Sequence, residues 1–255
     1  MNTKPKILIT NDDGIYSDGI YALWEALSEL GDVSVVAPST EKSAAGHAIT
    51  INNILKVKNV RRQGGFKGWA VSGTPADCTK MAVKEILDFK PDLLVSGINR
   101  GSNLGNNIIY SGTVSAATEG AILNIPSIAI SLDSHVVDSW ENSKEAAKDI
   151  AKHVLKNDLP KGTLLNVNVP SCSPDNLKGI KVTQQGAQYF KDEFEQRINP
   201  SKGTYYWMKG EIVDTDTSLE FDGRAVAENY ISVTPIHFNL TDKSFLEDLK
   251  GQFDG

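Results

Sequence analysis

The chain has 255 residues, of which 40% are hydrophobic and 23% are charged, and its formal net charge is −6 at pH 7. These proportions are ordinary for a globular protein with one sizeable core, and single α/β domains often reach this length. The negative charge disfavours broad attraction to nucleic-acid duplexes or acidic membranes. No apolar run approaches the roughly 18 residues that a membrane-spanning helix needs, so we expect no membrane partner.

The two cysteines, Cys78 and Cys172, are far apart in the sequence and have no partners at metal-ligand spacing. This usage argues against a disulfide framework or a thiolate zinc site and is typical of a reducing compartment. The apolar stretch at residues 6–10 is too short for a signal peptide. We therefore expect a cytoplasmic protein.

Short apolar runs alternate with amphipathic patterns through the first two-thirds of the chain. Thr74 and Pro75 mark one helix start, because an N-cap residue followed by proline favours the first helical turn. The patterns predict strands at residues 6–10, 33–37, 93–96, 127–132 and 164–169, and helices at 19–30, 74–88, 114–123 and 139–155. This alternation predicts an α/β fold, with a mostly parallel sheet and helices on both faces.

Two segments depart from this alternation. Residues 49–71 have a β-type pattern broken by Gly64 and Gly65, which predicts a hairpin inserted in the α/β core. Residues 186–222 mix aromatic and charged side chains with too little periodicity for a core layer, so we expect them to pack on their own domain or on a second subunit. A further strand at 231–236 and a terminal helix at 244–253 are predicted after them.

Adjacent carboxylates stand at the end of the first predicted strand, where Asp12 and Asp13 precede Gly14. Because like charges repel, an ordered pair needs a cation, a shared proton or a water molecule between them. Hard oxygen ligands suit Mg²⁺ or Mn²⁺ and, through the metal, a phosphate. A solvated turn is the alternative, since Asn, Asp and Gly are the commonest turn residues.

Three further polar loops, at residues 41–47, 96–107 and 110–113, accompany the predicted strands. Ligands of open parallel sheets bind beyond the carboxyl ends of the strands, where these loops would meet. The 96–107 loop is unusually long and holds four asparagines, whose side chains can bind a metal or an anion; a flexible surface loop is the alternative. Ser111 would cap a helix whose free amides favour an anion, although ordinary capping explains it equally well.

His47 is the one histidine of four that lies in such a loop, and we treat it as a catalytic candidate. The other three are expected to be structural or to face solvent. The chain has no G-x-x-x-x-G-K-[ST], G-x-G-x-x-G or G-x-S-x-G pattern. This disfavours a P-loop ATP site, a dinucleotide site and a serine-type hydrolase.

Specific sequence blocks occur in a fixed order over nearly the whole chain. They are residues 9–14 with 19–20, 36–38, 43 with 46–50, 72–78, 92–105, 110–117 and 230–235. By these blocks the chain resembles the SurE family, the stationary-phase survival proteins that act as 5′/3′-nucleotidases. The resemblance implies a single domain over residues 1–255, with a Rossmann-like core at 1–184. It also implies a β-rich C-terminal extension at 185–255, exchanged between the subunits of a homodimer or homotetramer.

The resemblance also implies a site. Its metal ligands would be Asp12, Asp13, Ser43 and Asn99, which hold one divalent cation per subunit, Mg²⁺ or Mn²⁺. Asp12, Asp13, Asn99 and His47 are the catalytic candidates, and Asn11, Ser111, Gly112 and Thr113 are candidates for contacts to the substrate phosphate. The implied reaction is hydrolysis of nucleoside 5′- and 3′-monophosphates, and of short polyphosphate, with His47 and a metal-bound water both candidates for the general acid.

Two positions depart from the family pattern. Glu41 and Lys42 stand where many members place an arginine before the serine, so the resemblance supplies no arginine for the phosphate there. Asn229 stands where a glycine commonly precedes the tyrosine. Because asparagine also tolerates a left-handed backbone conformation, we expect the helix end to survive.

Two other functions stay open from the sequence. The first is a nucleotide-binding or regulatory module that keeps the fold without chemistry, although such a module has no need of the four intact metal-ligand positions. The second is a metal-dependent glycosyl or nucleotidyl transferase, which would pass a group to an acceptor other than water.

Overall fold

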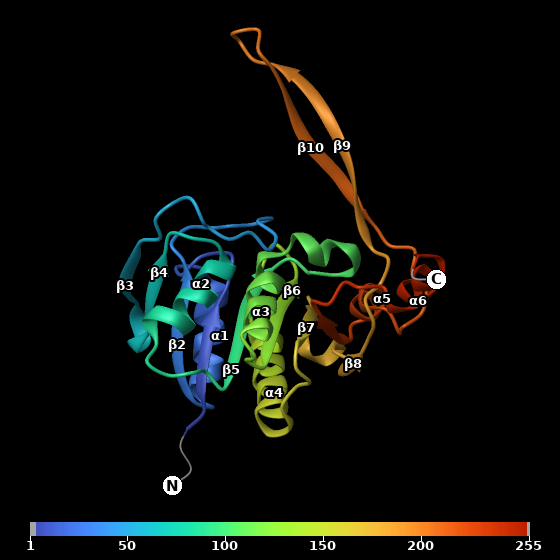
Figure 1. Ribbon diagram of the computed structural model, residues 1–255. Coiled ribbons are helices and arrows are strands. Elements are labelled where there is room, and N and C mark those ends of the chain that lie inside the picture. Colours follow the sequence, from blue (N-terminus) through green and yellow to red (C-terminus); the bar gives the residue numbers. More distant parts are fainter. Residues whose placement is uncertain (1–3, 254–255) are drawn as a thin grey trace.

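The computed structural model describes residues 4–253, which form a nine-stranded sheet flanked by helices and a separate two-stranded arm (Figure 1). The strand order of the main sheet is β3-β4-β2-β1-β5-β6-β7-β11-β8. Its strands are β1 (Lys6–Thr10), β2 (Asp32–Pro38), β3 (Val57–Arg61), β4 (Lys67–Val71), β5 (Leu93–Arg100), β6 (Ser127–Asp133), β7 (Thr163–Pro170), β8 (Ile180–Val182) and β11 (Ile231–His237).

Most neighbouring strands of this sheet are parallel, as the sequence predicts. From β4 through β2, β1, β5 and β6 to β7 every pair is parallel, whereas β3 and β11 pair antiparallel with β4 and β7. Parallel strands place all their carboxyl ends at one edge, where ligands bind in open sheets. Strand β11 follows residue 184 in the chain and still belongs to the main sheet.

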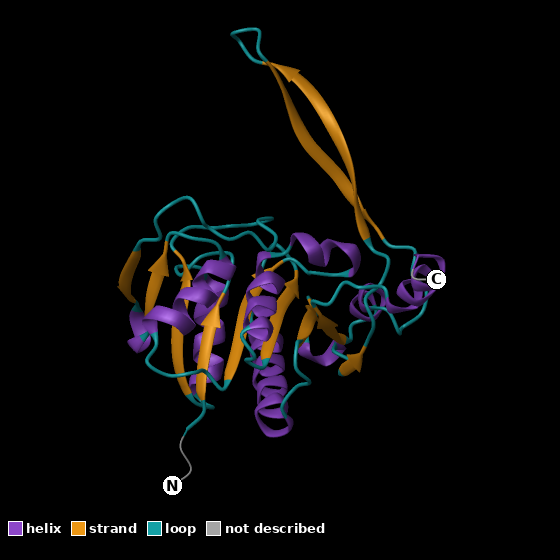
Figure 2. Ribbon diagram, in the orientation of Figure 1, coloured by secondary structure: helices purple, strands orange, loops and turns teal. Residues whose placement is uncertain are grey.

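Helices cover both faces of the sheet (Figure 2), which confirms the predicted layers. Residues of α1 (Asp18–Ser28) and α4 (Glu141–Asn157) share one buried cluster, and residues of α2 (Pro75–Met81) and α3 (Gly112–Ile122) share the other. Short helical segments are η1 (Gln63–Gly65), η2 (Ala82–Ile86), η3 (Gly105–Tyr110) and η4 (Pro174–Asn176), and two further helices are α5 (Asp222–Ala227) and α6 (Lys243–Phe253).

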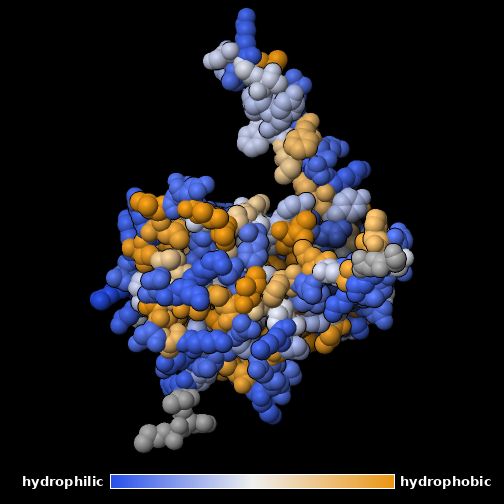
Figure 3. Space-filling view, viewed as in Figure 1, coloured by the Kyte–Doolittle hydropathy of each residue, from blue (hydrophilic) through white to orange (hydrophobic). Residues whose placement is uncertain are grey.

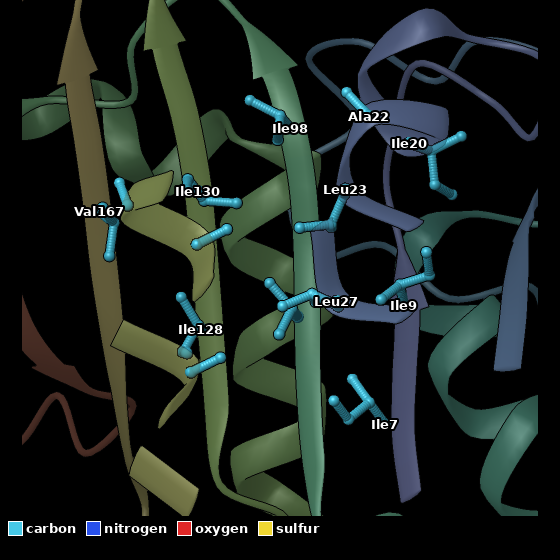
Figure 4. Packing of buried hydrophobic residues seen from close by; sticks show 14 of the residues in the cluster. Ile7, Ile9, Ile20, Ala22, Leu23, Leu27, Ile98, Ile128, Ile130 and Val167 are labelled. Carbon is cyan, nitrogen blue, oxygen red and sulfur yellow. The ribbon is translucent and has the colours of Figure 1, made fainter. Parts of the chain in front are cut away.

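Alternation along β1 shows why the sheet has two cores. Ile7 and Ile9 belong to the cluster under α1 and α4, and Leu8 belongs to the opposite cluster. Full burial of each such side chain stabilises the fold by roughly 1.5–3 kcal/mol. Figure 4 shows the first cluster, in which Leu23 and Leu27 of α1 lie against the isoleucines of the sheet.

Two predicted boundaries are wrong. The helix predicted at 74–88 ends at Ile86. Its last turn, η2, is a π-helix that closes with a hydrogen bond from the amide of Leu87 to the carbonyl of Ala82, and the backbone of Leu87 is already extended. The strand predicted at 93–96 runs on to Arg100 across an irregularity between Ser96 and Asn99. The beginning of the predicted 96–107 loop is therefore strand.

The hairpin predicted within residues 49–71 is present as the antiparallel pair β3–β4, with Gly64 and Gly65 in its turn. The end of α5 also agrees with the prediction. Asn229 adopts a left-handed conformation with φ of 65°, so asparagine replaces the family's glycine without loss of the helix end.

Within residues 4–253, strands β9 (Tyr189–Ile198) and β10 (Thr204–Val213) pair only with each other, and they project from the body of the molecule (Figure 1). We call this hairpin the arm. Its side chains are mostly exposed, including Phe194 at 64% and Trp207 at 57%. Figure 3 shows apolar and weakly polar side chains interleaved with hydrophilic ones along the arm. Across residues 4–253, no helix has the length and apolar character to cross a membrane.

Candidate functional site

The turn after β1 is held by Asn11, which is fully buried. Its side-chain amide donates to the carbonyl of Gly14 at 3.1 Å and to the hydroxyl of Ser17 at 2.8 Å, and its side-chain oxygen accepts from the amide of Gly14. Gly14 has φ of 94°, a conformation that favours glycine. The side chain of Asn11, a predicted phosphate contact, is thus engaged in fixing the direction of the next two residues.

Asp12 is buried at the end of β1 and faces the beginning of α3. Its Oδ1 accepts a 2.5 Å hydrogen bond from the Thr113 hydroxyl, and its carbonyl accepts from the amide of Lys42 at 2.7 Å. Burial raises the pKa of Asp12 to about 6; the bond from Thr113 opposes this shift and the charge of Asp13 adds to it. The approach of α3 is close: a Cβ on Gly112 would lie 2.7 Å from the Cβ of Asp12.

Asp13 has a side-chain oxygen, Oδ2, that is buried and has no hydrogen-bond partner. Burial raises the pKa of this carboxyl, while the charge and the backbone amide of Arg100 oppose the shift. A buried carboxylate oxygen without a donor is costly for a folded chain. The fold therefore leaves an unfilled acceptor beside Asp12, which fits a positively charged ligand.

Asn99 and Ser43 could complete an oxygen-rich cation site. The amide nitrogen of Asn99 donates to the carbonyl of Gly101 at 2.7 Å, which leaves its Oδ1 as the end outside that bond. The hydroxyl of Ser43 donates to Glu41 at 2.7 Å on the surface. Within residues 4–253 no group of three or more His, Cys, Asp or Glu side chains could hold a metal, so a cation here needs hydroxyl and amide oxygens besides the two carboxylates.

The beginning of α3 directs backbone amides toward Asp12. Ser111 caps the helix, because its hydroxyl accepts from the amide of Val114 at 3.1 Å. Ser111 thereby has a structural role, and the next amides, those of Gly112 and Thr113, are at the positive end of the helix dipole. This end lies directly beside Asp12, so a buried carboxylate and the positive end of a helix meet here.

His47 lies in a group that the sequence does not reveal. Its Nε2 is 3.0 Å from Glu119 of α3, and Lys80 of α2 donates to the other oxygen of Glu119 at 2.6 Å. Burial raises the pKa of Glu119, but His47 and Lys80 outweigh it and lower the pKa overall. A single charged residue within the small and apolar sequence of residues 112–122 is the signal that could have identified Glu119.

Two further residues have contacts that the sequence does not predict. Asn103, in the predicted 96–107 loop, is buried and bonded to Ser131, Asn166 and Asn168, so it joins the segment between β5 and η3 to β6 and β7. His135, predicted to be structural or to face solvent, is exposed, and it also lies near Asp13. Its ring lies against Gly101, and its charge is among those that lower the pKa of Asp13.

Fold and site together define an α/β protein in which Asp12, the first of two adjacent carboxylates, faces the N-terminus of a helix at the carboxyl edge of a parallel sheet. The model of the family described as survival protein SurE matches residues 7–192. The chain therefore belongs to the SurE family.

Similar proteins cover almost all of the chain. A protein of Thermosipho africanus named 5′-nucleotidase SurE is 47% identical, with 97% of each chain covered. A protein of Syntrophobacter fumaroxidans with the same name is 48% identical over 96% of this chain and 98% of its own. The crystal structure of the SurE protein from Aquifex aeolicus superposes with a TM-score of 0.84 at 42% identity, covering 97% of this chain and 99% of that one.

Proposed function

We propose that this chain is a divalent-cation-dependent nucleotidase, which hydrolyses nucleoside 5′-monophosphates to nucleoside and phosphate. The observation that carries the proposal is that Asp12 lies against the N-terminus of α3, while Oδ2 of the adjacent Asp13 is buried without a hydrogen-bond partner among residues 4–253. The names of the relatives from Thermosipho africanus and Syntrophobacter fumaroxidans support the 5′-nucleotide as substrate. The proposal includes activity on 3′-monophosphates and on short polyphosphate.

One Mg²⁺ or Mn²⁺ per subunit would be held by Asp12, Asp13, Ser43 and Asn99. The donor set fits these cations, because two carboxylates, a hydroxyl and an amide oxygen are hard ligands. The buried Oδ2 of Asp13, which has no hydrogen-bond donor among residues 4–253, would accept the cation. When bound, the cation supplies the positive charge that draws electrons from the phosphoryl group and stabilises the transition state.

The chain's own groups orient the substrate. The amides of Gly112 and Thr113 would donate to phosphate oxygens at the positive end of α3. Because Gly112 has no Cβ, the helix end reaches Asp12 closely and keeps cation and anion sites adjacent. The hydroxyl of Thr113 is bonded to Asp12, so it holds that carboxylate in one orientation. His47 has one ring nitrogen bonded to Glu119 and the other free to pass a proton to the leaving oxygen.

The arm supports the proposal that the protein is a homodimer or homotetramer whose C-terminal residues 185–255 are exchanged between subunits. Phe194, Tyr206 and Trp207 are each more than half exposed on a hairpin that pairs with no other strand of residues 4–253. Exposed apolar surface of this kind marks a surface that associates with a partner. We place the protein in the cytoplasm.

The proposal is tested with protein stripped by EDTA. Phosphate release from a panel of nucleoside monophosphates is measured before and after Mg²⁺ or Mn²⁺ is added back, with Asp12→Asn as the inactive variant. We expect release only with cation and only from the wild type, with water as the sole acceptor. A folded, cation-loaded protein that releases no phosphate from any nucleotide or polyphosphate would overturn the proposal and leave a binding module. Transfer to another acceptor would indicate a transferase.

A further inference from the structure

The loop after β2, residues 41–50, carries Ser43 and has no regular secondary structure, and most of its residues are exposed. Such a segment needs specific contacts to keep a fixed position. Near Ser43 the amide of Lys42 donates to the carbonyl of Asp12 and the amide of Gly46 donates to the carbonyl of Tyr110. At its far end the loop is held to α2, because the amide and hydroxyl of Thr50 donate to Asp77 and the hydroxyl of Thr74 donates to the carbonyl of Ala48. Nearer to Ser43, the side chain of His47 is bonded to Glu119.

Glu119 is well placed to hold this loop. It lies on α3 with only 2% of its surface exposed, and its two carboxylate oxygens are engaged separately, one by His47 and the other by Lys80. A buried carboxylate stays charged only with such partners. Removal of one partner therefore lowers the free energy of unfolding of the protein. His47 is therefore bound to a charged, rigidly placed partner.

Helix α3 thereby touches one proposed cation ligand, Asp12, and the loop that carries another, Ser43. At its first turn Thr113 is bonded to Asp12. Six residues later Glu119 is bonded to His47, which is four residues after Ser43. Since a helix rises 1.5 Å per residue, the two attachment points are about 9 Å apart along a rigid axis. The helix fixes where the Ser43 loop lies relative to Asp12.

We infer that Glu119 is a positioning residue that, through its bond to His47, holds the Ser43 loop against the cation site. The inference rests on the proposed function, and none of the comparisons assigns this role to Glu119. Partners one step removed from a metal orient its ligands, and their loss typically weakens metal affinity by about 10–100-fold. Glu119 touches neither substrate nor cation in this scheme.

Glu119 and His47 could instead have simpler roles, and these lead to different results. If Glu119 serves only the packing of α2 on α3, its bond to Lys80 should matter as much as its bond to His47. If His47 is only a general acid, its replacement should change the rate of hydrolysis and leave cation affinity unchanged. Four variants separate these cases: Glu119→Leu, Lys80→Met, His47→Ala and His47→Gln.

Binding of Mn²⁺ alone is measured by electron paramagnetic resonance of the free ion, together with melting temperature and hydrogen exchange of the loop amides. Glu119→Leu and His47→Ala should weaken Mn²⁺ binding by about tenfold or more and speed exchange at Lys42 and Gly46. His47→Gln retains a side-chain donor for Glu119 and should bind Mn²⁺ within about threefold of the wild type. Lys80→Met should lower the melting temperature but leave Mn²⁺ affinity within about threefold.

Equal Mn²⁺ affinity in the wild type, Glu119→Leu and His47→Ala would overturn the inference while leaving the nucleotidase proposal intact. Loss of affinity in Lys80→Met as large as in Glu119→Leu would also overturn it, in favour of a packing role. A wild-type protein that neither binds Mn²⁺ nor releases phosphate would refute the proposed function itself, which is a distinct result. If Glu119→Leu does not fold, the Mn²⁺ affinities of His47→Ala and His47→Gln are compared instead, because only the second variant retains a side-chain donor to Glu119.

Discussion

Two regions of the molecule differ in opposite ways from the usual burial of apolar residues and exposure of polar ones. They are the site edge, which is the carboxyl edge of the sheet around Asp12, and the arm. At the edge, Asn11, Asp12 and Thr113 are polar and almost fully buried, whereas in the arm Phe194 and Trp207 are large, apolar and mostly exposed. A buried polar group without a hydrogen-bond partner, such as Oδ2 of Asp13, lowers the stability of the fold, and exposed apolar surface favours association. Under the proposed function, a cation would complete the first region and a second subunit would cover the second.

The regions also differ in how they are held. Asp12 is fixed by α3 and by the loop after β2, and Asn11 fixes its own turn, so one folded chain determines the geometry of the edge. Within residues 4–253, the arm strands β9 and β10 pair only with each other. We therefore expect changes at the edge to act on chemistry within each chain, and changes in the arm to act on assembly.

Asp12→Asn should have the largest effect. The amide oxygen of asparagine can still accept the hydroxyl bond from Thr113, so the shape of the site is kept while the charge that would hold a cation is lost. We expect kcat for phosphate release to fall on the order of 10³-fold or more, measured at saturating Mn²⁺. The melting temperature without cation should not fall, because repulsion between Asp12 and Asp13 is removed.

Asp18→Asn is the matched control for this change. Asp18 lies in the first turn of α1, so this variant makes the same chemical replacement outside the site. It should keep the wild-type kcat. Activity of Asp12→Asn within about tenfold of Asp18→Asn would contradict the role of the carboxylate pair.

Removal of the arm should abolish assembly while leaving the edge intact. Phe190 and Ile212 are register partners, so residues 191–211 can be replaced by an Asn-Gly turn that keeps the pairing of the strands at its base. Light scattering should report a monomer, and circular dichroism should still report the α/β body. An assembly of unchanged mass would show that the arm is not the contact between subunits.

Gly112→Ala tests how closely α3 must approach the carboxylate pair. The added Cβ would lie 2.7 Å from the Cβ of Asp12 and 2.9 Å from its Oδ2, so helix or carboxylate must shift. A misplacement of this size in a site should reduce kcat by about 10–100-fold. Gly120→Ala in the same helix is the control: its Cβ would meet Ser127, away from the site, so stability should fall without a loss of kcat per folded molecule. Equal kcat in Gly112→Ala and the wild type would contradict the close approach.

The sequence predicts the layers of the fold well because they depend on local patterns. Alternating apolar runs locate the parallel strands, and Asn229 could be expected to tolerate a left-handed conformation because it stands where the resemblance places a glycine. The course of β5 beyond Ser96 could not be predicted, since Gly97 and the asparagines after it have the composition of a loop. Its pairing with β6 is a contact with a distant segment, which no local pattern records.

The site is less evenly predictable. Asp12 and Asp13 are recognisable because two carboxylates at a strand end are conspicuous, and the structure leaves an oxygen of Asp13 without a partner there. The group formed by His47, Glu119 and Lys80 could not be predicted, because its members lie on a loop and two separate helices. Only the packed fold brings them together. Ser111 needs no ligand to explain it, since it caps α3.

Asp77→Asn should have the smallest effect of these changes, on stability rather than chemistry. Asp77 accepts hydrogen bonds from the amide and hydroxyl of Thr50 and from the amide of Thr74, which closes a capping box on α2. Asparagine offers one acceptor oxygen in place of two, so at least one of these donors loses its partner. We expect a loss of about 1–3 kcal/mol in the free energy of unfolding at pH 7, measured by urea titration.

The pH dependence of this loss separates the charge of Asp77 from its shape. Burial raises the pKa of Asp77, but the bonds from Thr50 and Thr74 outweigh it and lower the pKa below the usual 3.8. A lowered pKa adds stability above the unfolded value, and that stability is lost as the pH falls through the folded value. The difference between wild type and Asp77→Asn should therefore be constant from about pH 5 to 8 and shrink below about pH 4. A difference that persists undiminished at lower pH would show that the charge of Asp77 contributes nothing and that its shape alone holds the loop to α2.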